Sequence, residues 1–336
     1  MCKSSSLTKE LYYNANKLRH QAVLDELQQL PKEEIIVIYH GGCPDGLTSA
    51  AIAYDALNKS DKVTFVPGAY ARPLDQEQLN IDDKTIIFCD FSYKYEEMAF
   101  IASKVRQLIF LDHHEAQILA LESLFLLPNV FRHASIEYSG ASLTWSFFHS
   151  LDNRPVPLFV KYIEDGDLYT FELQNSRNII RGLHSLLSKE IAENVKYLED
   201  MYLNYHLESI SLIGKALNEV SKKEAQNIIK NCRITVEAFG FKVPAVNATP
   251  DHTNLIGELI STTEDVPFVL IYTVYSDKVK ISLRSTEQAN QKVNLGILAK
   301  QHLEKNGFSG GGHATAGAGF MAIEEFYETI LSKRIN

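Results

Sequence analysis

Metal-binding types of side chain follow three short apolar runs in the first half of this 336-residue chain. A fourth acidic stretch follows a longer apolar segment further along. In chain order these residues are His40, Cys43 and Asp45; Asp90; Asp112-His113-His114; and Glu164-Asp165-Gly166-Asp167. Carboxylate and imidazole groups together favour Mn²⁺, Fe²⁺ or Zn²⁺ over Ca²⁺. The residue types therefore predict a site for divalent transition metals.

Such a site would suit phosphoryl chemistry. A carboxylate held between two metal ions about 3.5–4 Å apart forms part of a clamp for in-line displacement at phosphorus. A single aspartate after a strand is commonly a helix cap, and a single histidine is commonly a hydrogen-bonded core residue. Because the same residue types recur after several strands, we expect a convergent metal site rather than unrelated caps.

Alternating strands and helices would bring these residues together. Apolar, largely β-branched runs predict strands at 35–39, 63–66, 85–88 and 108–111. Helical spacing predicts helices over 7–30, 47–57 and 138–165. This order is typical of an α/β fold with a mostly parallel sheet flanked by helices, in which the carboxyl ends of neighbouring strands share one edge.

The second half of the chain has a different pattern. Residues 185–231 have helical spacing and mixed charges, which indicates a helical connector between two domains. Shorter strands are expected at 234–236, 243–246, 268–272 and 279–284, followed by a helix over 295–305. We therefore predict four parts: a helical extension (1–33), a catalytic α/β domain (34–185), a helical connector (186–232) and a smaller C-terminal α/β domain (233–336).

Composition narrows the range of partners. The chain has 42 acidic and 33 basic residues, a formal charge of −9. We do not expect it to bind long duplex DNA, because such binding needs many cationic contacts with phosphates. No apolar run approaches the ~20 residues that span a bilayer, so we expect no membrane association. Four scattered cysteines without a C-x-x-C motif favour a cytoplasmic location. The sequence leaves a homodimer open.

The ordered motifs resemble those of the DHH phosphoesterase family, whose name motif is Asp112-His113-His114. Its first motif is similar to 40–46 (HGGCPDG), its second to the strand ending at Asp90, and its fourth to 164–167. The C-terminal part resembles the DHH-associated domain at 281–285 (ISLRS) and 310–317 (GGGHATAG). The resemblance covers about residues 34–320 and places the chain near the nano-RNases and oligoribonucleases of the wider superfamily that includes RecJ.

The resemblance implies a role for individual ligands. Asp90 would bridge two Mn²⁺ ions, with His40 on one of them. Asp45, His113 and a carboxylate of the fourth motif would bind the other ion. Asp165 is the preferred candidate for that carboxylate.

Three further side chains have implied roles. Asp167 is the alternative carboxylate of the fourth motif. His114 would contact the scissile phosphate, and Asp112 would orient the histidines.

Cys43 departs from the family, which generally has aspartate at this position. A thiolate is a softer ligand that favours Zn²⁺ or Fe²⁺, or leaves one of the two metal positions weakly bound or empty. Cys43 as a small packed residue is an equal alternative, because free cysteines are often buried.

The C-terminal domain offers groups that bind anions. Glycine backbone amides can approach a phosphate closely, and an arginine guanidinium matches its geometry. By the resemblance, the residues for substrate binding are Arg284, Ser285, Gly310, Gly311, Gly312 and His313. We expect them to grip the phosphorylated end of a short substrate.

These observations favour a metal-dependent phosphodiesterase that degrades short 5′-phosphorylated oligonucleotides or linear dinucleotides. A phosphohydrolase acting on polyphosphate, pyrophosphate or a bisphosphorylated nucleotide shares the same metal core. A third alternative is a non-catalytic nucleotide-binding protein in which Cys43 marks a degenerate site. Aromatic platforms for bases would favour the nuclease. Tyr93, Tyr169 and Phe171 are candidates for such a platform, although core packing explains them equally well.

Overall fold

A computed structural model describes residues 4–69, 72–74, 79–152, 154–286, 293–304, 308 and 310–335, with side chains from residue 17 onward except at position 313. The chain divides into two compact units, Met1–Lys215 and Ala216–Asn336. Among the described helices, none combines the length and apolar character needed to cross a membrane.

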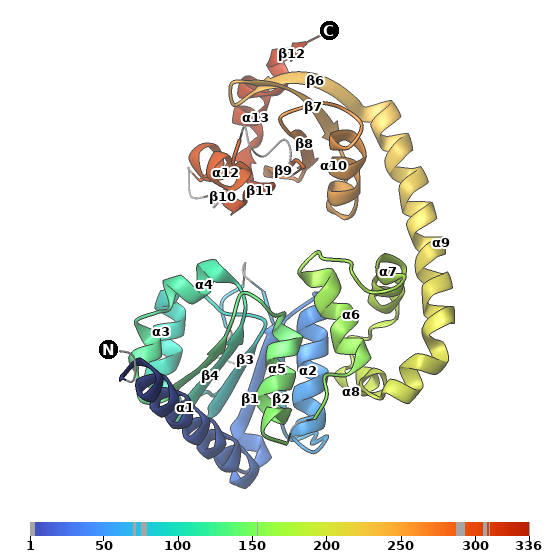
Figure 1. The fold of residues 1–336 in the computed structure, drawn as a ribbon. Coiled ribbons are helices and arrows are strands. Elements are labelled where there is room, and N and C mark those ends of the chain that lie inside the picture. Colours follow the sequence, from blue (N-terminus) through green and yellow to red (C-terminus); the bar gives the residue numbers. More distant parts are fainter. Residues whose placement is uncertain are drawn as a thin grey trace. The chain divides into compact units, whose positions relative to one another are not determined.

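The first unit is built on a sheet of five parallel strands in the order β2-β1-β3-β4-β5 (Figure 1). The strands are β1 (Ile35–His40), β2 (Thr64–Gly68), β3 (Thr85–Cys89), β4 (Gln107–Asp112) and β5 (Val130–Ala134). The predicted parallel α/β fold is confirmed, and four of these strands fall where the apolar runs predicted them. The edge strand β5 was not predicted, because Arg132 and His133 interrupt its apolar pattern.

Helices cover both faces of this sheet (Figure 1). On one face, α1 (Ser4–Gln29), α2 (Pro44–Ala56) and α5 (Gly140–His149) pack against Val37 and Ile87. On the other face, α3 (Tyr95–Lys104) packs against Ile38 and Phe88. Because both faces are buried, β1 and β3 are almost continuously apolar until the point where each strand ends.

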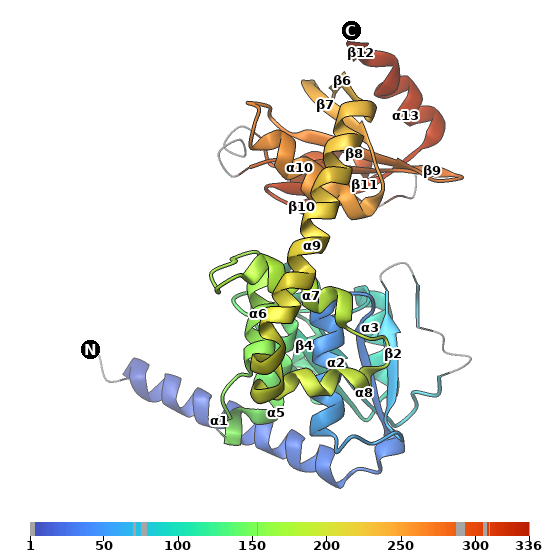
Figure 2. The ribbon, with the colours of Figure 1, turned by 90° about the vertical axis from the view of Figure 1, so that its right-hand side faces the viewer.

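Two predicted helices are broken. The expected helix over 138–165 is divided into α5 and α6 (Leu158–Asp167), because Pro155 and Pro157 lie between them. The connector expected over 186–232 contains the short α8 (Ile191–Asn194) and the long α9 (Asp200–Cys232), and it follows α7 (Ser176–Leu186). The division between the two units falls within α9, which Figure 2 shows as one continuous helix.

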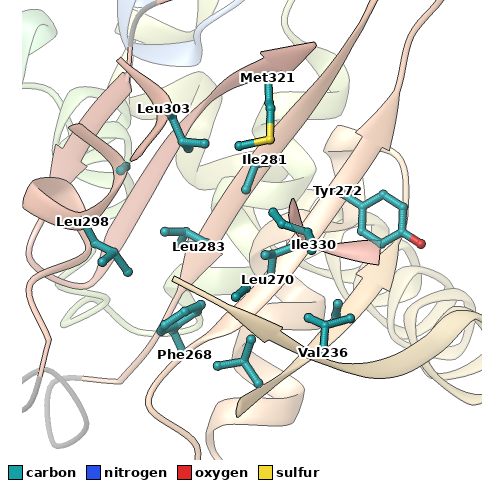
Figure 3. Packing of buried hydrophobic residues seen from close by; sticks show 14 of the residues in the cluster. Val236, Phe268, Leu270, Tyr272, Ile281, Leu283, Leu298, Leu303, Met321 and Ile330 are labelled. Atoms are coloured by element: carbon teal, nitrogen blue, oxygen red, sulfur yellow. The ribbon is translucent and has the colours of Figure 1, made fainter. Parts of the chain in front are cut away.

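The second unit contains a seven-stranded mixed sheet in the order β10-β11-β9-β8-β7-β6-β12. Its elements are β6 (Arg233–Ala238), β7 (Phe241–Asn247), α10 (Thr253–Ser261), β8 (Val269–Val274), β9 (Lys278–Arg284), α12 (Leu295–Leu303), β10 (Gly310–His313), β11 (Ala316–Ala322), α13 (Ile323–Thr329) and β12 (Arg334–Ile335). Figure 3 shows the core between one sheet face and α12, including Leu270, Leu283 and Leu298. Ile256 and Ile260 of α10 pack on the other face.

A half-buried histidine is expected to make the first unit sensitive to acid. His133 of β5 lies within 6.3 Å of the Phe147 ring and its Nε2 is 2.6 Å from Ser146 Oγ. Burial lowers the pKa of His133 to about 4, and neighbouring His20 of α1 acts in the same direction. Figure 2 shows α1 beside α5, where His20 Nε2 is 2.7 Å from the carbonyl oxygen of Phe147.

We predict that the free energy of unfolding falls as the pH drops from about 6.5 to about 4. In that window the unfolded chain binds a proton at position 133 and the folded chain does not, a difference of up to about 3 kcal/mol. Urea unfolding should show a shallower pH dependence for His133→Gln than for the wild type. An identical pH dependence in the two proteins would contradict this assignment.

Candidate metal centre

A tight turn after β1 delivers the first candidate ligands. Gly42 has a φ of +79°, which favours glycine, and a Cβ on Gly46 would lie 2.2 Å from the carbonyl oxygen of His40. Pro44 then starts α2 at the first helical position, where its lack of an N–H has no consequence. The turn therefore holds His40, Cys43 and Asp45 at the carboxyl edge of the sheet.

Asp90, directly after β3, faces two groups of candidate ligands. Its Oδ2 lies 3.4 Å from His40 Nδ1, and its Oδ1 lies 3.2 Å from His113 Nε2. The first group consists of His40, Cys43 and Asp90, with ligand atoms within 4.8 Å of one another. Asp90 adopts a positive φ of +56°. For a residue other than glycine this conformation is strained, and strain of this kind clusters at functional sites.

The second group is formed by Asp45, His113 and Asp167. His113 Nε2 lies 3.9 Å from Asp45 Oδ2 and 3.3 Å from Asp167 Oδ2. Since Asp90 Oδ1 also faces His113, the Asp90 carboxylate lies between the two groups. This is the arrangement expected of a carboxylate that bridges two metal ions.

Asp112 orients the histidines that follow it. The Asp112 side chain is fully buried, and its Oδ1 accepts hydrogen bonds from the backbone amides of His113 (2.7 Å) and His114 (3.2 Å). The same oxygen lies 2.7 Å from His114 Nδ1. Since a carboxylate only accepts, Nδ1 of His114 is the donor in this contact.

Asp165 has a structural role, which corrects the preference for it as a metal ligand. Its Oδ1 accepts hydrogen bonds from Thr170 Oγ1 and the Glu172 amide, both at 2.7 Å. Its Oδ2 accepts from the Leu173 amide at 3.2 Å and from Ser176 Oγ. Both oxygens are therefore already used within the loop after α6, and the structure brings Asp167 to the cluster instead.

The amino end of α5 also contributes to the site. The amides of Gly140 and Ala141 donate to Asp45 Oδ2 (2.6 Å) and Oδ1 (3.0 Å). A Cβ on Gly140 would lie 2.4 Å from the Asp90 Cβ, so only glycine allows this approach. Glu164 Oε2 accepts from the Ser139 amide at 3.1 Å. Ser139-Gly140 is the sequence signal for this contact, but its role was not predicted.

The charges of the cluster shift several pKa values. Burial raises the pKa of Asp45, and the nearby charges of Asp90 and Asp167 raise it further. Burial also raises the pKa of Asp167 and of the Cys43 thiol, and for Cys43 Asp90 and Asp45 act in the same direction. For Asp90, the neighbouring His113 and His40 outweigh the effect of burial and lower its pKa.

The pKa values of His113 and His114 in the cluster are raised. Burial acts to lower the pKa of both His113 and His114, but the carboxylates outweigh it. Asp90 raises the pKa of His113, and Asp112 raises that of His114 to about 9. In the protein without bound metal ions, these carboxylates therefore favour the imidazolium form of His114 at neutral pH.

The residues of the cluster fit divalent metal ions. Neither oxygen of Asp90 nor Nε2 of His113 has a hydrogen-bond partner of good geometry among the described residues, although all three atoms are buried. Buried polar atoms are normally satisfied. The surplus of carboxylates supplies negative charge, and the imidazoles suit Mn²⁺, Fe²⁺ or Zn²⁺. The thiol of Cys43 lies within the same group, so it also has the position of a ligand.

The anion-binding residues predicted in the second unit are only partly brought together. Arg284 Nε donates to Asn254 Oδ1 at 2.9 Å, and the buried Ser285 Oγ has no partner among the described residues. The glycines 310–312 form the edge strand β10 rather than a turn. Gly310 and Gly312 are needed for packing, since a Cβ would lie 2.6 Å from Ala299 O and 2.2 Å from Ala316 O, respectively.

Gly311 and His313 were also predicted to bind substrate. Gly311 has open space around it. The side chain of His313 lies outside the described part of the chain, although its backbone pairs with Ala316. Substrate binding by these residues remains a prediction.

Comparisons with known proteins match this architecture. Residues 239–334 match the DHHA1 domain model. Uncharacterized protein R106 of Acanthamoeba polyphaga mimivirus is 28% identical over 307 residues, which cover 86% of this chain and 68% of that protein.

Solved structures share the fold at low sequence identity. RecJ of Thermus thermophilus in complex with Mn²⁺ has a TM-score of 0.55 and 16% identity, over 92% of this chain and 52% of RecJ. This chain thus spans about half the length of that RecJ. A second structure, of an exonuclease RecJ bound to manganese, has a TM-score of 0.50 and 15% identity, over 92% of this chain and 91% of that one.

The DHHA1 match over residues 239–334, the shared fold and the ordered motifs whose side chains meet at Asp90 together support a member of the DHH phosphoesterase family.

Proposed function

We propose that the protein is a phosphodiesterase that hydrolyses short 5′-phosphorylated oligonucleotides or linear dinucleotides with two divalent ions. The observation that carries this proposal is the position of Asp90, whose two oxygens face His40 and His113 in two separate groups of ligands. Mn²⁺ is the proposed ion, since the donor set suits it and the similar RecJ of Thermus thermophilus was solved with Mn²⁺.

The ligands would be divided between two ions. His40, Cys43 and Asp90 would hold one ion, and Asp45, Asp90, His113 and Asp167 the other. Bound in this way, two divalent ions lower the pKa of an attacking water and neutralise charge on the phosphoryl oxygens.

Side chains of the protein complete the site. The imidazolium of His114 can donate a hydrogen bond to a phosphate oxygen through Nε2, because its Nδ1 is directed to Asp112. A charge-assisted hydrogen bond of this kind is stronger than a neutral one. Asp112 thereby fixes both the orientation and the charge of the group that meets the substrate.

Two properties favour a short phosphorylated substrate. The DHHA1 domain carries Arg284, whose guanidinium geometry suits a terminal phosphate. The net charge of −9 disfavours binding along a long duplex. Together they support a substrate that is recognised by its phosphorylated end.

Asp90→Asn should abolish turnover without unfolding the protein. Asparagine keeps the size of the side chain but cannot bridge two cations with charge, so kcat/KM should fall by about 10³-fold or more. The measurement is release of mononucleotides from a 5′-phosphorylated RNA dinucleotide with Mn²⁺, with an EDTA control. Circular dichroism and thermal melting check the fold of the variant.

Other outcomes would change the assignment. Substantial activity of Asp90→Asn would remove Asp90 from the reaction. Phosphate release from polyphosphate without dinucleotide hydrolysis would overturn the proposed substrate class but keep the metal centre. The absence of both activities in the wild type would contradict a phosphodiesterase and favour a nucleotide-binding role.

Asp165→Asn and Asp167→Asn form a matched pair that separates structural and metal-binding carboxylates. Asp167→Asn should weaken Mn²⁺ binding at least about tenfold. It should leave the metal-free protein as stable or more stable at pH 7, because the raised pKa of Asp167 means that folding disfavours its charge.

Asp165→Asn should give the opposite pattern. It replaces one of the two acceptor oxygens in the loop by an amide group and should lower the free energy of unfolding by about 1–3 kcal/mol. Its Mn²⁺ affinity should fall less than that of Asp167→Asn. Calorimetric Mn²⁺ titration and urea unfolding measure both effects, and a reversed ranking of the two variants would contradict the site described here.

A further inference from the structure

The loop that follows Asp167 holds two aromatic residues in a conformation that such residues rarely adopt. Tyr169 has a φ of +60° and Phe171 a φ of +53°. Tyr169 occupies the position after the end of α6 that glycine usually fills, and its amide donates to the Gly166 carbonyl at 3.2 Å. A left-handed conformation costs a bulky residue about 1–2 kcal/mol. Two such residues in one short loop indicate that their side chains are needed there.

Asp165 holds this strained loop in place. Besides the four hydrogen bonds to its carboxylate, its carbonyl oxygen accepts from the amides of Thr170 (3.1 Å) and Phe171 (3.2 Å). Six donors from residues 170–176 thus converge on one residue. The loop is therefore fixed in shape without any ligand.

The two aromatic rings form a partly exposed cluster with a cation over the Phe171 ring. The ring centroids of Tyr169 and Phe171 are 4.6 Å apart at an interplanar angle of 74°. The guanidinium of Arg177, in the first turn of α7, lies 3.9 Å from the Phe171 centroid and 5.5 Å from that of Tyr169. Tyr169 remains 58% exposed. A cluster that served core packing alone would bury this ring.

In the sequence, the aromatic residue Tyr169 closely follows the candidate metal ligand Asp167. Two peptide units separate Tyr169 from Asp167, so their Cα atoms are at most about 7.6 Å apart. Asp167 Oδ2 in turn lies 3.3 Å from His113 Nε2. A ligand whose phosphate is held at the metal centre would therefore have the rest of its structure within reach of this aromatic cluster.

We infer that Tyr169, Phe171 and Arg177 form a stacking platform for a nucleobase of the substrate. Aromatic faces and guanidinium planes stack on bases without strong sequence preference, and such stacking contributes about 1–3 kcal/mol per base. The inference rests on the proposed function and specifies it: the substrate is recognised by a base as well as by its phosphate. Polyphosphate offers no π-face to this platform.

Tyr169→Gly tests the platform without endangering the fold. Glycine adopts a positive φ without strain, so the variant should be at least as stable as the wild type in urea unfolding. Its kcat/KM for a 5′-phosphorylated adenine dinucleotide with Mn²⁺ should fall about 10- to 100-fold, chiefly through KM. The same dinucleotide backbone without bases should be hydrolysed by both proteins at nearly the same rate. Tyr169→Phe, which keeps the aromatic face, should stay near the wild type.

The comparison of the two substrates decides the outcome. A loss confined to the base-carrying dinucleotide supports the platform. An equal loss on both substrates would show that Tyr169 only supports the metal centre, and no loss on either would show that the ring does not contact the substrate. Each of these two results overturns the inference.

A binding measurement separates failure of the platform from failure of the proposed function. If the wild type hydrolyses no dinucleotide, the proposed function fails, and AMP and ribose 5-phosphate are titrated into the Mn²⁺-loaded full chain. Tighter binding of AMP than of ribose 5-phosphate, lost in Tyr169→Gly, supports the platform. Equal affinity for the two ligands, or no binding of AMP, overturns it.

Discussion

Negative charge is concentrated around one imidazole nitrogen of the first unit. The carboxylates of Asp45, Asp90 and Asp167 approach His113 Nε2 at 3.9, 3.2 and 3.3 Å. Carboxylates taken out of water must be compensated by cations, hydrogen-bond donors or metal ions. The surrounding elements supply that compensation. The amino end of α5 donates two amides to Asp45, and the histidines have raised pKa values.

The close approach of these charged groups also explains which residues occupy the neighbouring positions. Gly140 has no side chain because a Cβ would meet Asp90, and Gly46 has none because a Cβ would meet the carbonyl of His40. Asp90 itself adopts a positive φ immediately after its strand. The site is thus assembled at the expense of local backbone preference, which is a common property of functional sites. Divalent ions would complete the compensation of charge.

Much of this organisation could be predicted from the sequence. Strands buried on both faces leave an unambiguous apolar run, and their carboxyl ends must meet, so the convergence of His40, Asp90 and His113 followed from the pattern. The choice between Asp165 and Asp167 did not follow. Residues two apart on a helix point in different directions, and which one faces the sheet depends on how α6 packs.

Other features depended on tertiary contacts as well. β5 carries polar residues that only its neighbours can accommodate, and the glycines of β10 form a strand because α12 and β11 approach them closely. Asp165 organises the loop after α6 through donors that are distributed over residues 170–176. No local sequence motif predicts such a network. This network also fixes the segment that carries the proposed aromatic platform, because Tyr169 and Phe171 lie in the same loop.

In the proposed site the Asp90 carboxylate joins two metal ions. Electron paramagnetic resonance of the Mn²⁺-loaded protein tests it directly, because two Mn²⁺ ions that share a bridging carboxylate are magnetically coupled. A coupled two-ion signal should develop as the second equivalent of Mn²⁺ is added. A spectrum of isolated, uncoupled Mn²⁺ ions at full loading would contradict it.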